Sequence, residues 1–246
     1  SFTEEQLAHI LALQNRGEKI TDIANGNIRL AFLAGIRAMS DGYQAICNAE
    51  DIFKNYYSRI IDDTELTKED ILMLFFIAVA GPVKSDENQL YNDLMKEYGD
   101  GIAEDNTIER LYSLELIDWF KNEITKVSDQ SLGNYILYYV LFEKKWISVE
   151  NLIALGFPRY RNKIVYVLNT LIEIFDSSEL VKYVEDSVIA AWNNAPAGQG
   201  MEYLESFCQV NPDKALFLLT KRIECGNAVK FDLRSFDIDS KKNYHN

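Results

Sequence analysis

The chain has 246 residues, of which 48% are hydrophobic, and its formal net charge is −13. This composition is typical of a folded protein, and the acidic balance disfavours non-specific binding to nucleic-acid phosphates and anionic membranes. No apolar run approaches the roughly 20 residues that a membrane-spanning helix needs. Three cysteines, Cys47, Cys208 and Cys225, lack metal-ligand spacing. We therefore expect reduced, mostly buried thiols in a cytoplasmic protein.

The common sequence motifs of active sites are missing. There is no G-x-x-x-x-G-K-[ST] phosphate-binding loop and no G-x-G-x-x-G motif after a strand. The two histidines, His9 and His245, lie at opposite ends of the chain, which argues against a histidine metal site or catalytic triad. Acidic pairs such as Glu69-Asp70 are typical of solvated helix starts. We expect neither catalytic residues nor a metal site in this chain.

The sequence predicts a mainly α fold of three parts, which begins with a small helical bundle over residues 1–63. Thr3 and Gln6 form a capping box that starts the first helix. The turn Asn25-Gly26-Asn27 starts a later helix, with Asn27 as its N-cap. Further helices of this bundle are predicted over residues 19–24, 27–40 and 45–61.

The next part, residues 64–146, is predicted to be a winged-helix-like domain. Thr67 caps its first helix, which ends near Gly81-Pro82. Two β-prone runs, 116–120 and 123–127, predict a β-hairpin. Three helices followed by a hairpin make the winged-helix plan. The second and third helices are predicted over residues 88–98 and 106–114, and Ser128 is expected to cap the helix after the wing.

The last part, residues 147–246, is predicted to be a helical repeat region. Paired helices of this length with short joints are typical of α-solenoids of the HEAT or TPR kind. Pro212 fits the first turn of the last helix. No convincing polar capping repeat follows Gly226, so we expect the array to continue beyond this chain. The helices are predicted over residues 149–155, 161–175, 178–192, 200–210 and 212–225.

Two segments resemble one known family. Gly26-Asn27-Ile28-Arg29-Leu30-Ala31 is similar to the Gly-Asn-Pro-Arg-Leu-Ala segment in the lid region of STAND-type P-loop NTPases, relatives of the AAA+ ATPases. Residues 127–137, which follow the predicted wing and open a helix, resemble the serine- and leucine-rich helix of the same proteins. The resemblance covers residues 1 to about 145, and residues 146–225 only by class.

This resemblance implies a regulatory, protein-interaction fragment of a larger nucleotide-dependent switch protein in signalling or defence. Gly26, Asn27 and Arg29 are then the cofactor-binding candidates. Arg29 opposes the dipole at its helix start, and the terminal phosphates of ATP or ADP would offset that charge. The nucleotide and Mg²⁺ would be bound by a P-loop domain outside this chain, which itself would hold no cofactor. Ile28 departs from the family proline, which leaves the adenine-side contact open.

The expected partners are that NTPase domain or other proteins, and no membrane is expected. The alternative is a winged-helix DNA-binding regulator whose recognition helix spans residues 105–114. Acidic residues around that helix and on the wing repel phosphate, so DNA is the less favoured partner. The charged residues concerned are Glu104, Asp105, Glu109 and Arg110 on the helix, and Asp118, Lys121, Glu123 and Lys126 on the wing.

One local cluster of positive charge stands out elsewhere. Arg159, Arg161 and Lys163 lie together at the start of a predicted helix. They either form part of a protein-binding patch with the aromatic residues Phe157 and Tyr160 or neutralise neighbouring acids.

Overall fold

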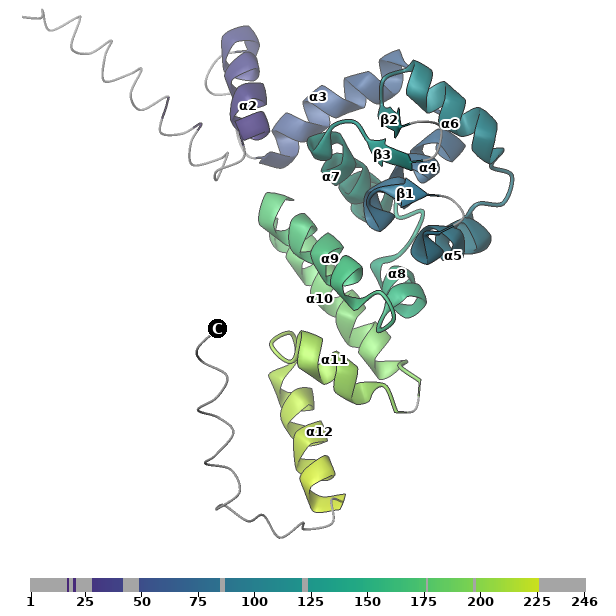
Figure 1. Ribbon diagram of the computed structural model, residues 1–246. Coiled ribbons are helices and arrows are strands. Elements are labelled where there is room, and N and C mark those ends of the chain that lie inside the picture. The colour runs from purple at the N-terminus through teal and green to yellow at the C-terminus, as the bar shows by residue number, and fades with distance from the viewer. Residues whose placement is uncertain are drawn as a thin grey trace, which may run out of the picture.

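The computed structural model describes residues 17, 20, 28–41, 49–84, 87–120, 124–175, 177–196 and 198–225 (Figure 1). Its described part holds eleven α-helices and a three-stranded antiparallel sheet, which confirms the mainly α prediction. The elements are α2 (Ile28–Asp41), α3 (Ala49–Asp63), α4 (Lys68–Ala80), β1 (Val83–Lys84), α5 (Gln89–Tyr98), α6 (Glu104–Ser113), β2 (Ile117–Phe120), β3 (Ile124–Val127), α7 (Gln130–Tyr138), the π-helix η2 (Tyr139–Glu143), α8 (Val149–Gly156), α9 (Arg161–Phe175), α10 (Ser178–Asn193), α11 (Gly200–Phe207) and α12 (Pro212–Cys225).

Helix α4 is the centre of the upper part of the molecule. The predicted capping box is present: the Thr67 hydroxyl accepts from the Asp70 amide at 3.2 Å, and the Thr67 amide donates to the Asp70 carboxylate at 2.9 Å. Ten of its thirteen residues are buried, because α5, α6, α7, α9 and β3 all pack against it. The helix ends at Gly81, whose φ of 78° lies in the left-handed region that favours glycine.

The sheet joins the predicted hairpin to a third strand. β2 and β3 pair antiparallel, with Trp119 opposite Thr125, which confirms the hairpin. β1 pairs with the other edge of β3, where Val83 faces the same Thr125, so the strand order is β1-β3-β2. β1 was not predicted, because two residues carry no periodic pattern.

The helix after the hairpin begins differently from the prediction. Asp129, not Ser128, caps α7, and its carboxylate accepts from the Ser131 amide at 2.9 Å. The Ser128 hydroxyl instead donates to the Glu115 carbonyl at 2.8 Å, so it is not available to cap the helix. The tertiary turn at Glu115 therefore decides which side chain caps α7.

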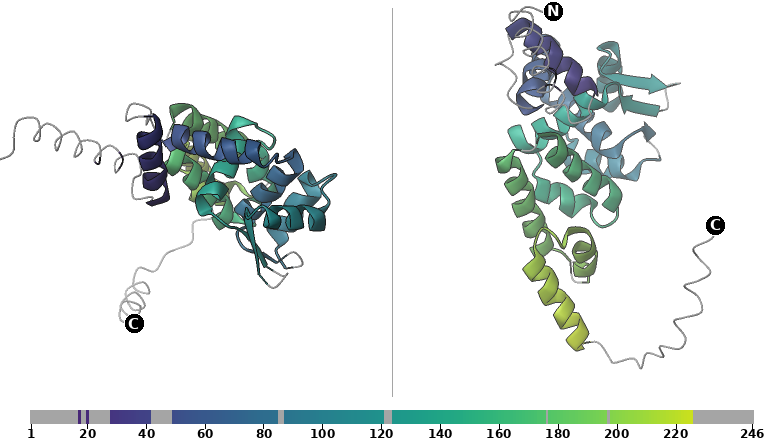
Figure 2. Two further views of the ribbon diagram at one scale, coloured as in Figure 1. Left: turned by 90° about the horizontal axis from the view of Figure 1, so that it is seen from above. Right: turned by 90° about the vertical axis from the view of Figure 1, so that its left-hand side faces the viewer.

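Helices α8 to α12 extend away from the part of the molecule that contains the sheet, and α12 lies farthest from it (Figures 1 and 2). Helices α8, α9 and α10 pack together, α11 packs on α10, and α12 packs on α11. The helix predicted over residues 200–210 ends at Phe207. Cys208 and Cys225 are free and exposed, so the expectation of mostly buried thiols is wrong for both, and Cys47 lies outside the described residues.

One continuous hydrophobic core runs from α2 to α12 and crosses both predicted domain boundaries. The division of the chain into three domains stays a prediction. Its aromatic part joins three helices: Tyr57 of α3 stacks on Tyr135 of α7 at 5.6 Å between ring centroids, and Tyr138 of α7 stacks on Phe175 of α9 at 4.4 Å. The predicted helices that begin near Thr3 and Lys19 lie outside the described residues. No described helix is both long and apolar enough to cross a membrane.

Candidate functional site

The predicted nucleotide-facing residues lie at the margin of the described structure. Gly26 and Asn27 are outside the described residues, and of Arg29 only the backbone, in the first turn of α2, is described. α2 is described from Ile28 onward, and the turn predicted before it, Asn25-Gly26-Asn27, lies outside the described residues. The role of Gly26, Asn27 and Arg29 in nucleotide sensing stays a prediction.

The arginine of α6, the third helix of the predicted wing domain, is partly exposed, with 42% of its side chain accessible, and contacts two groups of the same chain. The Arg110 guanidinium lies 3.4 Å from the Asp70 carboxylate of α4. It also donates a hydrogen bond to the Glu65 carbonyl at 2.8 Å. One contact is to α4 and the other to the turn that precedes it, so the charge of Arg110 already has a carboxylate partner within the chain.

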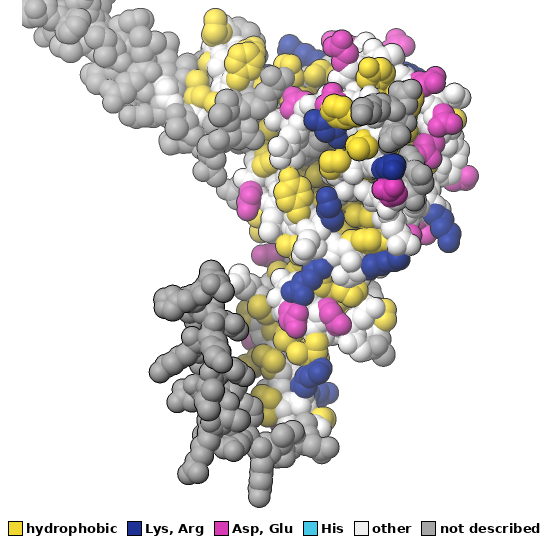
Figure 3. Space-filling view, viewed as in Figure 1, with side chains coloured by type: hydrophobic (Ala, Val, Ile, Leu, Met, Phe, Trp, Pro, Cys, Tyr) yellow, Lys and Arg dark blue, Asp and Glu magenta, His cyan; other side chains and the backbone are white. Residues whose placement is uncertain are grey.

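The hairpin is similarly poor in free positive charge. The Lys126 amine lies 3.1 Å from the Asp118 carboxylate on the neighbouring strand, and 5.4 Å from the Phe120 ring centroid. Phe120 and Ile124 are the exposed apolar residues of the hairpin. Acidic side chains gather over the side of the molecule that carries α6 (Figure 3). Lys121 and Glu123 lie outside the described residues.

A groove lies between the corner where α4 meets β1 and the start of α9. It consists of two adjacent hollows, with cavity volumes of about 360 Å³ and about 330 Å³, which meet at Pro82. Tyr160, Lys163 and Tyr166 line the opposite side. Their spacing of three residues places them on one side of the helical segment.

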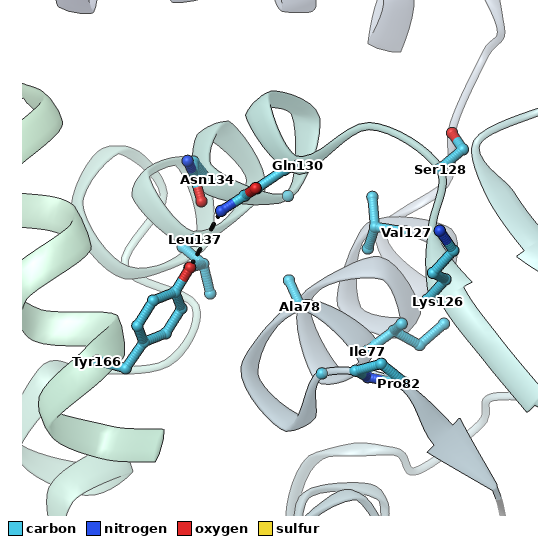
Figure 4. A pocket seen from close by; sticks show the side chains of 12 residues that line it. Ile77, Ala78, Pro82, Lys126, Val127, Ser128, Gln130, Asn134, Leu137 and Tyr166 are labelled. Carbon is cyan, nitrogen blue, oxygen red and sulfur yellow. Dashed lines mark hydrogen bonds between the residues drawn. The ribbon is translucent and has the colours of Figure 1, made fainter. Parts of the chain in front are cut away.

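The first hollow has apolar walls and a polar rim (Figure 4). Gln130 of α7 reaches across to α9, where its amide nitrogen donates to the Tyr166 hydroxyl at 3.2 Å. Gly133 also lines the hollow, and a Cβ atom there would make an ordinary contact with Ala78 at 3.7 Å. The apolar wall residues are Ile77, Ala78, Pro82, Val127 and Leu137.

Asn134 supplies a hydrogen-bonding group to this hollow. The residue is only 7% exposed and lines the hollow from α7. Among the described residues its carboxamide has no hydrogen-bond partner. Its nitrogen and oxygen are not among the fully buried unpartnered atoms of the described residues, so they stay accessible from the hollow and suit a ligand that both donates and accepts hydrogen bonds.

The second hollow is lined mainly by polar side chains. The Tyr160 hydroxyl donates to the Asp93 carboxylate at 2.7 Å, and burial together with this carboxylate raises the pKa of Tyr160 to about 12. The Lys84 amine pairs with Glu87 at 2.6 Å. Other lining residues are Asn88, Gln89 and Leu90.

Lys163 lines the second hollow and lies against Gly81, which lines the first. A Cβ atom built on Gly81 would be 2.6 Å from its amine nitrogen, so the amine rests directly over the glycine. No ion pair within the described part of the chain involves Lys163. A side chain at Gly81 would displace this amine, which gives the glycine a second role beside its positive φ.

The other members of the predicted basic cluster neutralise acids. Arg159 lies 3.7 Å from Asp93, and Arg161 lies 3.0 Å from Glu205 of α11. Lys163 differs from both because it faces the groove. Sequence reasoning found the cluster but not the groove, because the residues that form it come from segments that are far apart in the chain.

Comparisons with known protein families, with curated proteins and with solved structures found no match for this chain. The described residues contain no group of three or more histidine, cysteine or acidic side chains placed to hold a metal ion.

Proposed function

We propose that residues 68–127 form a winged-helix module that contacts protein rather than DNA. The order α4-β1-α5-α6-β2-β3 and the strand order β1-β3-β2 both support a winged helix. The ion pair of Arg110 with the buried carboxylate of Asp70 is the observation that carries the choice of partner. A DNA-reading helix needs cations directed at phosphate, and the arginine on α6 is held against α4 instead.

We propose further that the chain is the regulatory part of a larger nucleotide-dependent switch protein of the STAND type. In this view α2 and α3 belong to the lid, and α8 to α12 form an α-solenoid-like array. Helix α12 supports a protein contact, because large exposed apolar residues gathered on one element are typical of interaction surfaces. These residues are Leu216, Phe217, Leu219 and Ile223.

The nucleotide part of the proposal concerns a domain outside this chain. ATP or ADP with Mg²⁺ would be bound there by a P-loop, and Arg29 would contact the terminal phosphates. The chain itself would act through protein contacts and not as an enzyme. The resemblance around Gly26 and Arg29 supports this assignment.

The test uses the intact parent protein. A P-loop should be encoded upstream, and Arg29→Ala should weaken nucleotide-dependent switching by on the order of 1.5–3 kcal/mol, because a charge-assisted hydrogen bond is lost. Arg59→Ala is the matched control, since Arg59 is an exposed arginine on α3. Absence of a P-loop, or equal effects of the two substitutions, would reject the switch assignment.

Binding of duplex DNA, followed by fluorescence anisotropy at physiological salt, separates this proposal from the DNA-binding alternative. We expect no sub-micromolar complex. Binding that is tight and that weakens steeply with salt would instead show direct phosphate contacts. Arg110→Glu is unsuitable as the diagnostic variant, because it would place a second acid beside Asp70.

A further inference from the structure

We infer that the groove between the α4–β1 corner and α9 binds an extended, acidic segment of a protein partner. An apolar side chain of that segment occupies the hollow beside Asn134, and a carboxylate pairs with Lys163. The inference rests on the proposed function only in that this chain contacts protein, and it requires neither a nucleotide nor a P-loop domain.

The length of the groove matches a short extended segment. Tyr160, the residue before α9, lines the second hollow, and Tyr166 of α9 lines the first. Six residues of helix span about 9 Å at 1.5 Å per residue. An extended chain advances about 3.3 Å per residue, so about three residues of a partner fit between these two tyrosines.

The first hollow selects an apolar side chain with a neighbouring peptide group. Its walls include Ile77, Val127 and Leu137, against which a buried charge would be unfavourable. The carboxamide of Asn134 offers a donor and an acceptor side by side, and the N–H and C=O of one residue in an extended segment present the complementary pair. The ring of Tyr166, 49% exposed at the rim, adds apolar surface for the same segment.

The charge of the partner follows from the pairing of the lysines. Lys84 forms an ion pair with Glu87, and Lys126 forms one with Asp118. Lys163 has no carboxylate partner within the described structure. Lysine and arginine side chains are visible over α9 and the nearby sheet (Figure 3). The Debye length is about 8 Å at physiological ionic strength, so the net negative charge of the rest of the molecule is largely screened from this point.

The spacing between the two recognition points is also defined. Lys163 and Tyr166 are three residues apart, which corresponds to about 4.5 Å along α9. In an extended chain this distance is covered by one or two residues. The partner segment should therefore carry its acid one or two positions from its apolar residue.

Four fluorescein-labelled peptides test the inference. They place leucine and aspartate in a glycine–serine background, adjacent or separated by one residue, in both orders. We expect at least one of them to bind the chain with a dissociation constant below about 1 mM, measured by fluorescence anisotropy. Its asparagine analogue should bind about tenfold more weakly, because the pair with Lys163 is lost.

Matched variants identify the site. Lys163→Glu should remove the preference for aspartate over asparagine, and Lys163→Arg should retain it. Lys182→Glu makes the same charge change at an exposed position on α10 and should leave the preference intact. Asn134→Ala should weaken both peptides. If that variant does not fold, as judged by circular dichroism, Tyr166→Ala tests the same hollow from its exposed rim.

Three results would overturn the inference: no binding by any of the peptides, equal effects of Lys163→Glu and Lys182→Glu, or equal affinity for aspartate and asparagine peptides. Binding of inorganic phosphate that displaces the peptide from the unsubstituted chain and from Lys182→Glu, and that is lost in Lys163→Glu, would assign the groove to a phosphate ligand instead and overturn the inference. None of these outcomes bears on the Arg29 or DNA experiments, so a failure here is distinguishable from a failure of the proposed function.

Discussion

Arg110 and Asp70 form an ion pair that joins α6 to α4, with Nη1 3.4 Å from Oδ2. The Asp70 side chain is only 4% exposed, and the same oxygen accepts the Thr67 amide at 2.9 Å. Arg110 also bonds the carbonyl of Glu65, a residue with a φ of 49°. One carboxylate therefore completes the cap of α4 and also fixes the helix that a DNA-binding protein would use for recognition.

We predict that Arg110→Ala lowers the free energy of unfolding by about 1–3 kcal/mol, because the buried Asp70 carboxylate loses its cationic partner. Lys126→Ala is the control: it breaks an exposed pair with Asp118 and should cost less than about 1 kcal/mol. Urea denaturation of both variants measures the difference. Equal losses would mean that the Arg110–Asp70 pair is no stronger than a surface contact.

Tyr138 should stabilise the packing of α7 against α3 through its hydroxyl. This group donates to the Glu50 carboxylate at 2.7 Å, and the ring is buried. Tyr138→Phe retains the stacking on Phe175 and should lower the free energy of unfolding by about 1 kcal/mol. Tyr139→Phe is the control, because no hydrogen bond of its hydroxyl is found among the described residues. The effect of Tyr138→Phe should disappear in the background of Glu50→Ala.

Stability should fall at alkaline pH because the fold holds several tyrosines protonated. Burial is the largest cause of each raised pKa, and Tyr160 reaches about 12 against an ordinary value of 10.0. The unfolded chain loses these protons first, so the contribution is complete below pH 10 and is lost as the pH rises through 12. The tyrosines with a raised pKa are Tyr91, Tyr98, Tyr135, Tyr138, Tyr160 and Tyr203.

Ultraviolet absorbance of tyrosinate measures this directly when native and urea-unfolded protein are titrated in parallel. In the native protein some of the tyrosines should ionise at a higher pH than in the unfolded protein. Tyr160→Phe should remove the part of this high-pH absorbance change that occurs near pH 12. Coincident titration curves below the unfolding transition would contradict the prediction.

Gly156 should not tolerate a side chain, although it ends a helix. A Cβ atom there would lie 2.6 Å from Cδ1 of the buried Ile164. Gly156→Ala should therefore lower the free energy of unfolding by about 1–3 kcal/mol through overpacking between α8 and α9.

Gly35→Ala is the matched control for that substitution. Gly35 lies inside α2 with nothing within 4 Å of the added atom, so alanine should be neutral or stabilise by up to about 1 kcal/mol through its higher helix propensity. Thermal denaturation should show a lower melting temperature for Gly156→Ala and an unchanged or higher melting temperature for Gly35→Ala. Similar losses would exclude the clash with Ile164 as the cause.

Much of the secondary structure was predictable because its signals are short-range. Thr67 and Asp70 cap α4 from positions three residues apart, Gly81 ends it, and Pro212 starts α12 as expected. Capping and apolar periodicity act within one or two turns of a helix, so a linear pattern contains all the residues that are needed. The mainly α composition and the hairpin followed from such patterns.

Contacts between distant segments followed from the tertiary structure alone. Val83 became a strand residue only by pairing with Thr125. Asp129 caps α7 in place of Ser128, because the Ser128 hydroxyl donates its hydrogen bond to the Glu115 carbonyl. No local pattern encodes such competition, since each outcome depends on a partner brought close by the packing of other elements.

The candidate sites divide in the same way. The sequence by itself determined the acidic character of the chain, the basic cluster around Lys163 and the motif at Arg29. Only the tertiary structure decided that Arg110 is bound to Asp70 and that Lys163 faces a groove beside Asn134. The physical reason is that a charge is paired or unpaired according to its neighbours in space, and these neighbours come from helices that lie far apart in the chain.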